Sequence, residues 1–190
     1  MLGVNIEVYG FDNAEGLPEP VDHRDLPYHW KPGFSHMDLA LLRSKLRRAQ
    51  LVIGDTRDTT HTFAEQYHRA PIGAISFDLD FHASTVAALR ILEASPPYLL
   101  PRMVVFFDEV VGREIELYTD FTGVRLAIHE FNRDHDRRKL SPLYYLRAID
   151  PITWWHHKMW SLHAFDHPKY VRFVSEENQQ IPLKETALSA

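Results

Sequence analysis

The stretch PIGAISFDLDFHAST, residues 71–85, decides the predicted fold of this chain. Within it, residues 72–77 form a short apolar run that ends at Asp78, and residues 103–107 form a second such run that ends at Asp108. Both runs are too short for free-standing helices. Their composition is typical of strands that are buried on both faces of a parallel sheet.

The segment between these two strands has the pattern of a helix. Ala88, Leu89 and Leu92 fall on one helical face, and Ser84 or Thr85 is placed to cap its start. Two consecutive prolines at 96–97 prevent the helix from continuing. The whole stretch therefore predicts a βαβ unit with a right-handed crossover and two parallel strands.

Four acidic residues follow the two predicted strands: Asp78, Asp80, Asp108 and Glu109. The carboxyl ends of parallel strands meet at one edge of the sheet, where open α/β folds bind ligands. Carboxylates held close together repel one another unless a proton or a cation neutralises them, and Mg²⁺ prefers oxygen ligands. The pattern indicates a metal site, although single aspartates in these positions also cap helices.

Several motifs together resemble the macrocin O-methyltransferase family, whose members are class I, S-adenosylmethionine-dependent and Mg²⁺-dependent methyltransferases acting on sugar hydroxyls. The resemblance runs from residue 6 to residue 131. It rests on IGAISFDLDFHAST, on VVFFDEV, on a helix with Gly123, Ala127, Glu130 and Phe131, on IEVYGFDNAEGLPEP followed by Trp30, Gly33 and Phe34, and on LVIGDTRDT.

The resemblance implies roles for the acidic edge. Asp78, Asp108 and Glu109 would hold Mg²⁺, which would bind oxygens of a sugar-like acceptor and lower the pKa of its hydroxyl. Asp80 would take the proton of that hydroxyl as general base. His82 would orient the acceptor, although a histidine in this position is also an ordinary helix-start residue.

Two further aspartates are cofactor candidates by the same resemblance. Asp12 ends a predicted strand at residues 6–11 and would hold the ribose of S-adenosylmethionine, or else start a turn with Asn13. Asp55 follows a short strand at residues 51–54 and would bind the adenine amino group, or else cap a helix.

The start of the chain departs from the family pattern. Class I methyltransferases begin with a central strand and a Gly-rich turn for the cofactor, whereas this chain begins at the equivalent of the second strand and has no G-x-G. The predicted fold is therefore an N-terminally truncated α/β, Rossmann-like methyltransferase sheet with helices on both faces. Either the strands at 6–11 and 72–77 pair directly, or a second copy covers the exposed edge. We expect a homo-oligomer that binds S-adenosylmethionine weakly or not at all.

The remaining segments complete one predicted domain, residues 1–190. Residues 13–34 contain four prolines and two glycines and predict a lid-like loop, or an aromatic plug packed on the body. Residues 35–49 predict a helix with Ser35 and Asp38 at its start and a buried leucine stripe. Four further segments follow: a helix that begins at Thr122 or at Asp120, a strand at 143–146, a hairpin of edge strands after residue 154 and a flexible tail at 179–190.

Composition narrows the classes of protein. The chain has 190 residues, 45% hydrophobic and 25% charged, with a formal net charge of −5 and no cysteine. These values fit a globular protein without disulfides or a Cys-ligated metal. The charge argues against a nucleic-acid partner, and neither a membrane span nor a signal peptide is indicated. We expect a cytoplasmic protein. The histidines show no HExxH spacing that would favour a histidine metal site.

Two other functions remain open. FDLD after a strand also resembles the nucleophile motif of haloacid-dehalogenase-type phosphatases, with Asp78 as nucleophile and Asp80 as acid/base. A methyltransferase-like subunit that binds a partner or a sugar without catalysis is the second, and the missing Gly-rich turn favours it.

Overall fold

The computed structural model describes residues 6–67, 70–112 and 117–175, and their strands form two sheets. The larger sheet has the order β3-β4-β6-β5, and the smaller one pairs β1 with β2. The tail predicted for residues 179–190 lies outside the described residues. The strands are β1 (Val8–Asp12), β2 (Ala49–Ile53), β3 (Ile72–Phe77), β4 (Leu99–Phe107), β5 (Arg138–Pro142) and β6 (Met159–Ala164).

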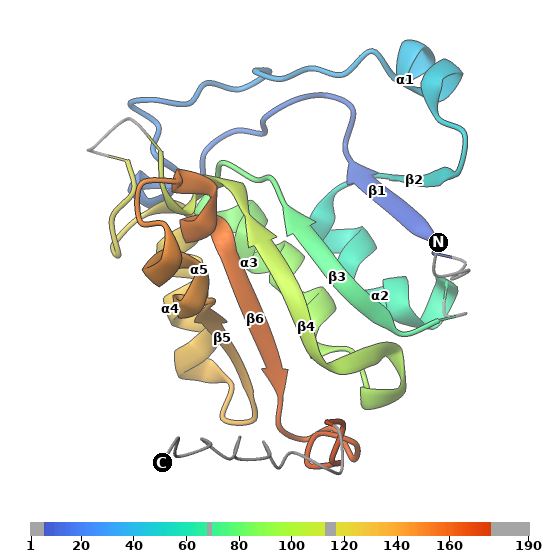
Figure 1. The fold of residues 1–190 in the computed structure, drawn as a ribbon. Coiled ribbons are helices and arrows are strands. Elements are labelled where there is room, and N and C mark those ends of the chain that lie inside the picture. The colour runs from blue at the N-terminus through green and yellow to red at the C-terminus, as the bar shows by residue number, and fades with distance from the viewer. Residues whose placement is uncertain (1–5, 68–69, 113–116, 176–190) are drawn as a thin grey trace, which may run out of the picture.

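Helices connect these strands, and α2, α3 and α4 lie behind the strands in the view of Figure 1. The chain thus has the mixed α/β, Rossmann-like architecture that the sequence predicts. The helices are α1 (Leu39–Lys45), α2 (Thr56–Tyr67), α3 (His82–Leu89), α4 (Gly123–Asp134) and α5 (Tyr144–Ile149), with 3₁₀ turns that include η1 (His23–Asp25), η4 (Asp108–Val110) and η5 (Trp154–Lys158).

The predicted βαβ unit is present. Strand β3 has the predicted bounds and pairs in parallel with β4, which begins earlier than expected, at Leu99. The expectation that both strands are buried on both faces is wrong for β3, where Gly73, Ala74 and Ser76 are exposed. The reason is the strand order, which puts β3 at the edge of its sheet rather than in the interior.

The main core lies between the larger sheet and its helices. Helix α4 starts after Thr122, as predicted, and buries Val124, Ala127, Ile128 and Phe131. Central side chains of the sheet, among them Val105, Phe107 and Leu162, have no exposed surface and belong to the same apolar cluster. Burial of this apolar surface holds α4 against the sheet.

Helix α2 joins the smaller sheet to the rest of the molecule. Phe63 packs edge-on against Tyr9 and Phe11 of β1, with ring centroids 5.0 and 4.9 Å apart. The Thr60 hydroxyl donates a hydrogen bond to the carbonyl oxygen of Ala87 in α3 at 2.9 Å. The sequence indicated this helix only through Asp55 as its possible cap.

Strands β1 and β3 do not pair with each other among the described residues, because each belongs to a separate sheet. The direct pairing of segments 6–11 and 72–77 that the sequence left open is therefore not formed. In the part of the chain that the structure describes, each of these two strands presents one edge whose backbone groups have no partner strand. Unprotected edges of this kind are templates for pairing with another strand.

Two predicted helix starts differ from the structure. Helix α1 begins at Leu39 and not at Ser35, whose backbone is left-handed with φ 62°. Asp38 caps this helix, and its leucine stripe is only half-buried. Helix α3 begins at His82, before Ser84 and Thr85, so neither residue caps it.

The prediction of a strand at residues 143–146 is wrong. These residues precede and begin α5, while the strand lies earlier, at β5. Asn132 in α4 fixes that position, because its side-chain amide exchanges hydrogen bonds with both backbone groups of Leu140. The predicted hairpin of edge strands after residue 154 is also corrected. In the described residues β6 is the one strand that follows residue 154, and it lies inside the sheet, between β4 and β5.

Candidate functional site

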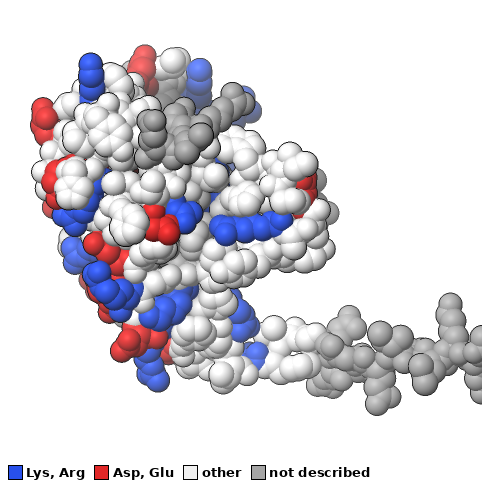
Figure 2. Space-filling view, turned by 90° about the vertical axis from the view of Figure 1, so that its left-hand side faces the viewer, with Lys and Arg blue, Asp and Glu red and all other residues white. Residues whose placement is uncertain are grey.

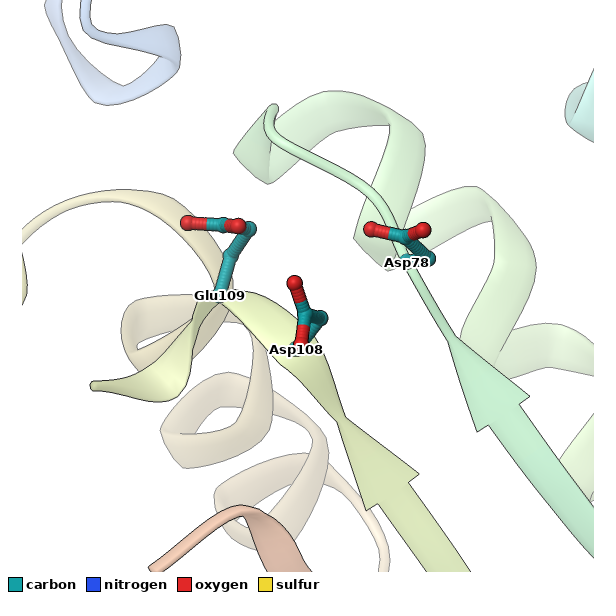
Figure 3. Close-up of side chains that lie close together, drawn as sticks. All are labelled: Asp78, Asp108 and Glu109. Carbon is teal, nitrogen blue, oxygen red and sulfur yellow. The ribbon is translucent and has the colours of Figure 1, made fainter. Parts of the chain in front are cut away.

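Three carboxylates converge at the carboxyl edge of the larger sheet. Asp78 follows β3, and Asp108 and Glu109 follow β4 within η4. One oxygen from each of the three residues lies within 4.8 Å of the others (Figure 3). Parallel pairing places the ends of β3 and β4 side by side, because Phe77 is in register with Phe107. The sequence-predicted acidic edge is thus assembled in space.

A small, shallow hollow lies beside this cluster. Asp80 and Glu109 line its acidic side, and Trp30, Tyr118 and Leu26 contribute an aromatic and apolar side. The Tyr118 hydroxyl donates a hydrogen bond to Glu109 Oε2 at 2.9 Å. The hollow therefore combines a carboxylate wall with flat aromatic surfaces, an arrangement suited to a small polar molecule with an apolar face.

The pKa values of Asp78, Asp80 and Glu109 are shifted upwards. Burial, followed by the charges of Asp78 and Asp108, raises the pKa of Asp80 to about 6. Burial also raises the pKa of Glu109 to about 7, against the lowering effect of the Tyr118 hydrogen bond. The pKa of Asp78 is raised by desolvation and by Asp108. Carboxylates with pKa values near neutrality exchange protons readily at physiological pH.

Lys158 supplies a positive charge to the cluster. It ends η5, is 2% exposed, and places Nζ 2.6 Å from Asp108 Oδ1. Sequence reasoning did not identify it. Its signal in the sequence is a single lysine inside the aromatic run WWHHKMW, residues 154–160, where an ordinary surface lysine would not be expected.

The donor set of the acidic cluster fits a hard divalent cation. Carboxylate oxygens are the ligands that Mg²⁺ prefers, and three of them from two adjacent strand ends leave the outer side for water or a ligand. This set contains no histidine.

His82 lies outside this hollow. It is 5% exposed, and its Nε2 atom lies 2.6 Å from Glu130 Oε2. Arg24 from the 13–34 loop also approaches Glu130, with 3.9 Å between Nη1 and Oε1. Through Glu130 of α4, these contacts connect His82 of α3 with Arg24 of the loop. Orientation of an acceptor by His82 stays a prediction.

The two cofactor candidates follow the two strands of the smaller sheet. Asp12 accepts the backbone N–H of Ala14 at 2.5 Å, which forms a turn at the end of β1. Asp55 caps α2 by accepting the backbone N–H of Arg57 at 2.8 Å, and it forms an ion pair with the side chain of that residue. The alternative expectations for these two residues, a turn at Asp12 and a helix cap at Asp55, are both present. Contact of either residue with a nucleoside stays a prediction.

The loop at residues 13–34 is anchored in its middle. Asp25 and Leu26 are 1% and 4% exposed, whereas Tyr28 nearby is 67% exposed. Two backbone hydrogen bonds close its base: Leu17 donates its N–H to the carbonyl oxygen of Phe34 and accepts the N–H of Gly33. The segment thus combines a buried anchor with exposed aromatic side chains, and its motion as a lid stays a prediction.

Surface charge and helix length bear on the expected absence of a nucleic-acid partner and of a membrane span, and both stay predictions. Figure 2 shows one side of the molecule, where basic and acidic side chains are interspersed rather than gathered into one basic field. No helix in the described part of the chain is long and apolar enough to cross a membrane.

Comparisons with known proteins show a shared fold. No family model matches this chain, and no curated protein matches it significantly. The chain superposes on the crystal structure of CalS11, a calicheamicin methyltransferase, with a TM-score of 0.54 and 24% identity over 72% of this chain and 56% of that one. An apo structure of CalS11, described as a TDP-rhamnose 3'-O-methyltransferase, gives 27% identity over 72% and 54%, with a TM-score of 0.41 that is too low to carry an argument. The chain spans just over half the length of the CalS11 chain in the first superposition, and what the two share is the fold.

Proposed function

We propose that this protein transfers a methyl group from S-adenosylmethionine to a hydroxyl of a sugar-like small molecule, with assistance from a divalent metal ion. The observation that carries the proposal is the convergence of Asp78, Asp108 and Glu109 next to the hollow that contains Asp80. The fold shared with the methyltransferase CalS11 and the motif resemblance to sugar O-methyltransferases point the same way.

Asp80 acts as the general base. Its raised pKa, about 6, leaves it ionised at neutral pH and basic enough to accept a proton from a hydroxyl that is being activated. As the acceptor oxygen forms a bond to the methyl carbon, its proton passes to the Asp80 carboxylate. The electrons of the breaking carbon–sulfur bond leave with sulfur, so that the products are an ether and a thioether.

The acidic cluster holds the metal ion. Asp78, Asp108 and Glu109 would be its ligands, and the ion would lower the pKa of the acceptor hydroxyl. Trp30 and Tyr118 then flank the acceptor from the other side of the hollow and orient its ring. Fixing the hydroxyl next to Asp80 supplies much of the rate, because positioning removes the entropic cost of bringing the reactants together.

The nucleoside end of the cofactor is placed along the smaller sheet. Asp12 would reach the ribose and Asp55 the adenine amino group, from the ends of β1 and β2. S-Adenosylmethionine would supply a methyl group on a positively charged sulfur. Since Asp55 is paired with Arg57, binding of adenine would share or replace that ion pair.

A methyl-transfer assay tests the proposal. The full chain is incubated with radiolabelled S-adenosylmethionine and a panel of nucleotide sugars, with Mg²⁺ or with a chelator. We expect label in the sugar with Mg²⁺ only, and a loss of about 10²–10⁴ in rate for Asp80→Asn. The control is Asp58→Asn, which removes an exposed carboxylate from α2. Phosphate release from a generic phosphoester, with no label transferred, would instead favour the phosphatase reading of FDLD.

A further inference from the structure

A lysine already sits in the acidic cluster as its counter-ion. The Nζ atom of Lys158 lies 2.6 Å from Asp108 Oδ1, and the lysine side chain is 3% exposed. An ammonium group withdrawn from water to this degree needs a charged partner, because an unpaired buried charge is strongly destabilising. Asp108 supplies that partner from a position 50 residues earlier in the chain.

Aromatic rings hold the lysine in place. Nζ lies 4.2 Å from the centroid of the Trp154 ring and 6.0 Å from that of Phe106. A cation over an aromatic face is attracted by the negative face of the ring, and this attraction strengthens when the cation is desolvated. Trp154 and Lys158 are the two ends of η5, so a single turn brings both the cation and its ring to Asp108.

The charge of Lys158 also acts on the other two carboxylates. Its attraction opposes the upward shifts of pKa at Asp78 and Glu109, but both shifts remain upward. One lysine therefore compensates the cluster only in part. The cluster therefore keeps an excess of negative charge that favours binding of a further cation. At Asp108 that cation would lie next to the ammonium group of Lys158.

We propose that Lys158 competes with a divalent metal ion for Asp108 and thereby sets the metal affinity of the site. The inference rests on the proposed function in one respect, that the ion binds at Asp78, Asp108 and Glu109. An ammonium group has three protons and no lone pair, so it cannot join a metal's ligand shell. An ion that approaches Asp108 either displaces Lys158 or binds against its repulsion, and both outcomes weaken binding.

Two states of the cluster follow from this competition. Without metal, Lys158 neutralises Asp108 and stabilises the carboxylate edge. With metal, the ion takes over that neutralisation and Lys158 loses its partner. The lysine and the ion are thus alternative counter-ions, and each should substitute for the other in stabilising the fold.

Metal binding by variants of the full chain tests the proposal. Calorimetry with Mn²⁺ and with Mg²⁺, without cofactor or acceptor, is carried out on wild type, Lys158→Met, Lys158→Gln and Lys158→Arg. We expect the Met and Gln variants to bind about tenfold more tightly or better, since the competing charge is gone. Lys158→Arg keeps the charge and should bind like wild type, as should Lys169→Met, which removes an exposed lysine. Equal or weaker binding by both uncharged variants would overturn the proposal.

Thermal unfolding, with and without Mg²⁺, tests the proposal even if the uncharged variants are less stable than wild type. The uncharged variants should melt below wild type without metal, and saturating Mg²⁺ should raise their melting temperatures more than that of wild type. A variant that folds only when Mg²⁺ is present would support the proposal. Failure of both uncharged variants to fold even at saturating Mg²⁺ would count against it, because the ion would then not replace the lysine.

The outcome is separable from that of the proposed function, because binding needs no turnover. Tighter metal binding by the uncharged variants, in a protein that transfers no methyl group, upholds this inference and rejects the function. If wild type transfers the methyl group but the variants bind metal with unaltered affinity, the proposed function is upheld and this inference is rejected. Absence of metal binding in every variant overturns the inference and the metal's role, and the methyl-transfer assay alone then decides whether the reaction occurs.

Discussion

Asp25 accepts the backbone N–H of Ala83 through Oδ1 at 2.8 Å, so a residue of the 13–34 loop caps helix α3. Its other oxygen, Oδ2, accepts the N–H of Val21 at 2.7 Å within the loop itself. A carboxylate near the first turn of a helix is favoured by the partial positive charge of that end. This single side chain therefore links the fold of the loop to the helix that follows Asp80.

We predict that Asp25→Ala destabilises the protein by about 1–2 kcal/mol, because two backbone N–H groups lose their acceptor in a buried place. Urea unfolding measures the change. Asp38→Ala, which removes the exposed cap of α1, serves as the control and should cost less. Limited proteolysis of the Asp25 variant should also cut residues 13–34 faster than in wild type, and an unaltered unfolding midpoint would contradict this prediction.

The metal ligands give a second prediction. Asp78→Asn should weaken Mg²⁺ binding by at least about tenfold. Replacing a residue that only supports a metal ligand already lowers metal affinity by about that factor. Asp78 is chosen because its replacement leaves the ion pair between Lys158 and Asp108 in place. Calorimetry compares it with Asp120→Asn, which changes an exposed carboxylate that is paired with Arg125. Equal affinity in both variants would remove Asp78 from the site.

The raised pKa of Asp80 gives a third prediction, on stability in the absence of metal. The folded value of about 6 lies above the ordinary 3.8, so between these values the folded state holds a proton that the unfolded chain has lost. Stability from this group is therefore present at low pH and is lost as the pH rises through that window. Asp80→Asn should stabilise the protein more at about pH 8 than at about pH 4.

Urea unfolding at the two pH values, with a chelator present, checks the sign. Asp58→Asn is again the control, because its carboxylate is exposed on α2. A gain in stability that is the same at both pH values, or larger at the acid one, would show that Asp80 titrates normally.

The unpaired edges of β1 and β3 lead to a fourth prediction. A second copy of the chain would satisfy their backbone groups, so we expect wild type to be an oligomer. Ala74→Lys places a charge on the exposed part of β3 and should shift the protein towards monomer, because charged residues on edge strands block strand addition. Light scattering measures the mass of both proteins. A wild type that is monomeric, or an Ala74→Lys variant of the same mass as an oligomeric wild type, would contradict this prediction.

Local sequence signals predicted the centre of the fold well. The run at β3 and the spacing of α4, with its cap at Thr122, agree with the structure because composition and periodicity act within each element. The assembly of Asp78 with Asp108 and Glu109 followed from parallel pairing alone. These are cases in which a local pattern and one topological rule are sufficient.

Contacts between distant segments could not be predicted in this way. The cap of α3 comes from Asp25, 58 residues before Ala83, while nearby Ser84 and Thr85 have the right chemistry. Lys158 reaches Asp108 across 50 residues, and nothing in the local pattern pairs the two. The apolar run at 143–146 is equally compatible with a strand and a helix, and only Asn132 and the neighbouring β5 decide between them.

The division of the strands into two sheets has a mechanical consequence for the proposed reaction. Asp12 and Asp55 follow strands of the smaller sheet, whereas Asp78 and Asp108 follow strands of the larger one. In the described residues no ladder of backbone hydrogen bonds crosses between the two sheets, and the packing of α2 through Phe63 and Thr60 joins them. In the proposed reaction, the distance between methyl donor and acceptor would thus be set by packed side chains and not by strand pairing. A shift of about 1 Å in that packing would slow the transfer by about 100-fold without altering any residue of the site.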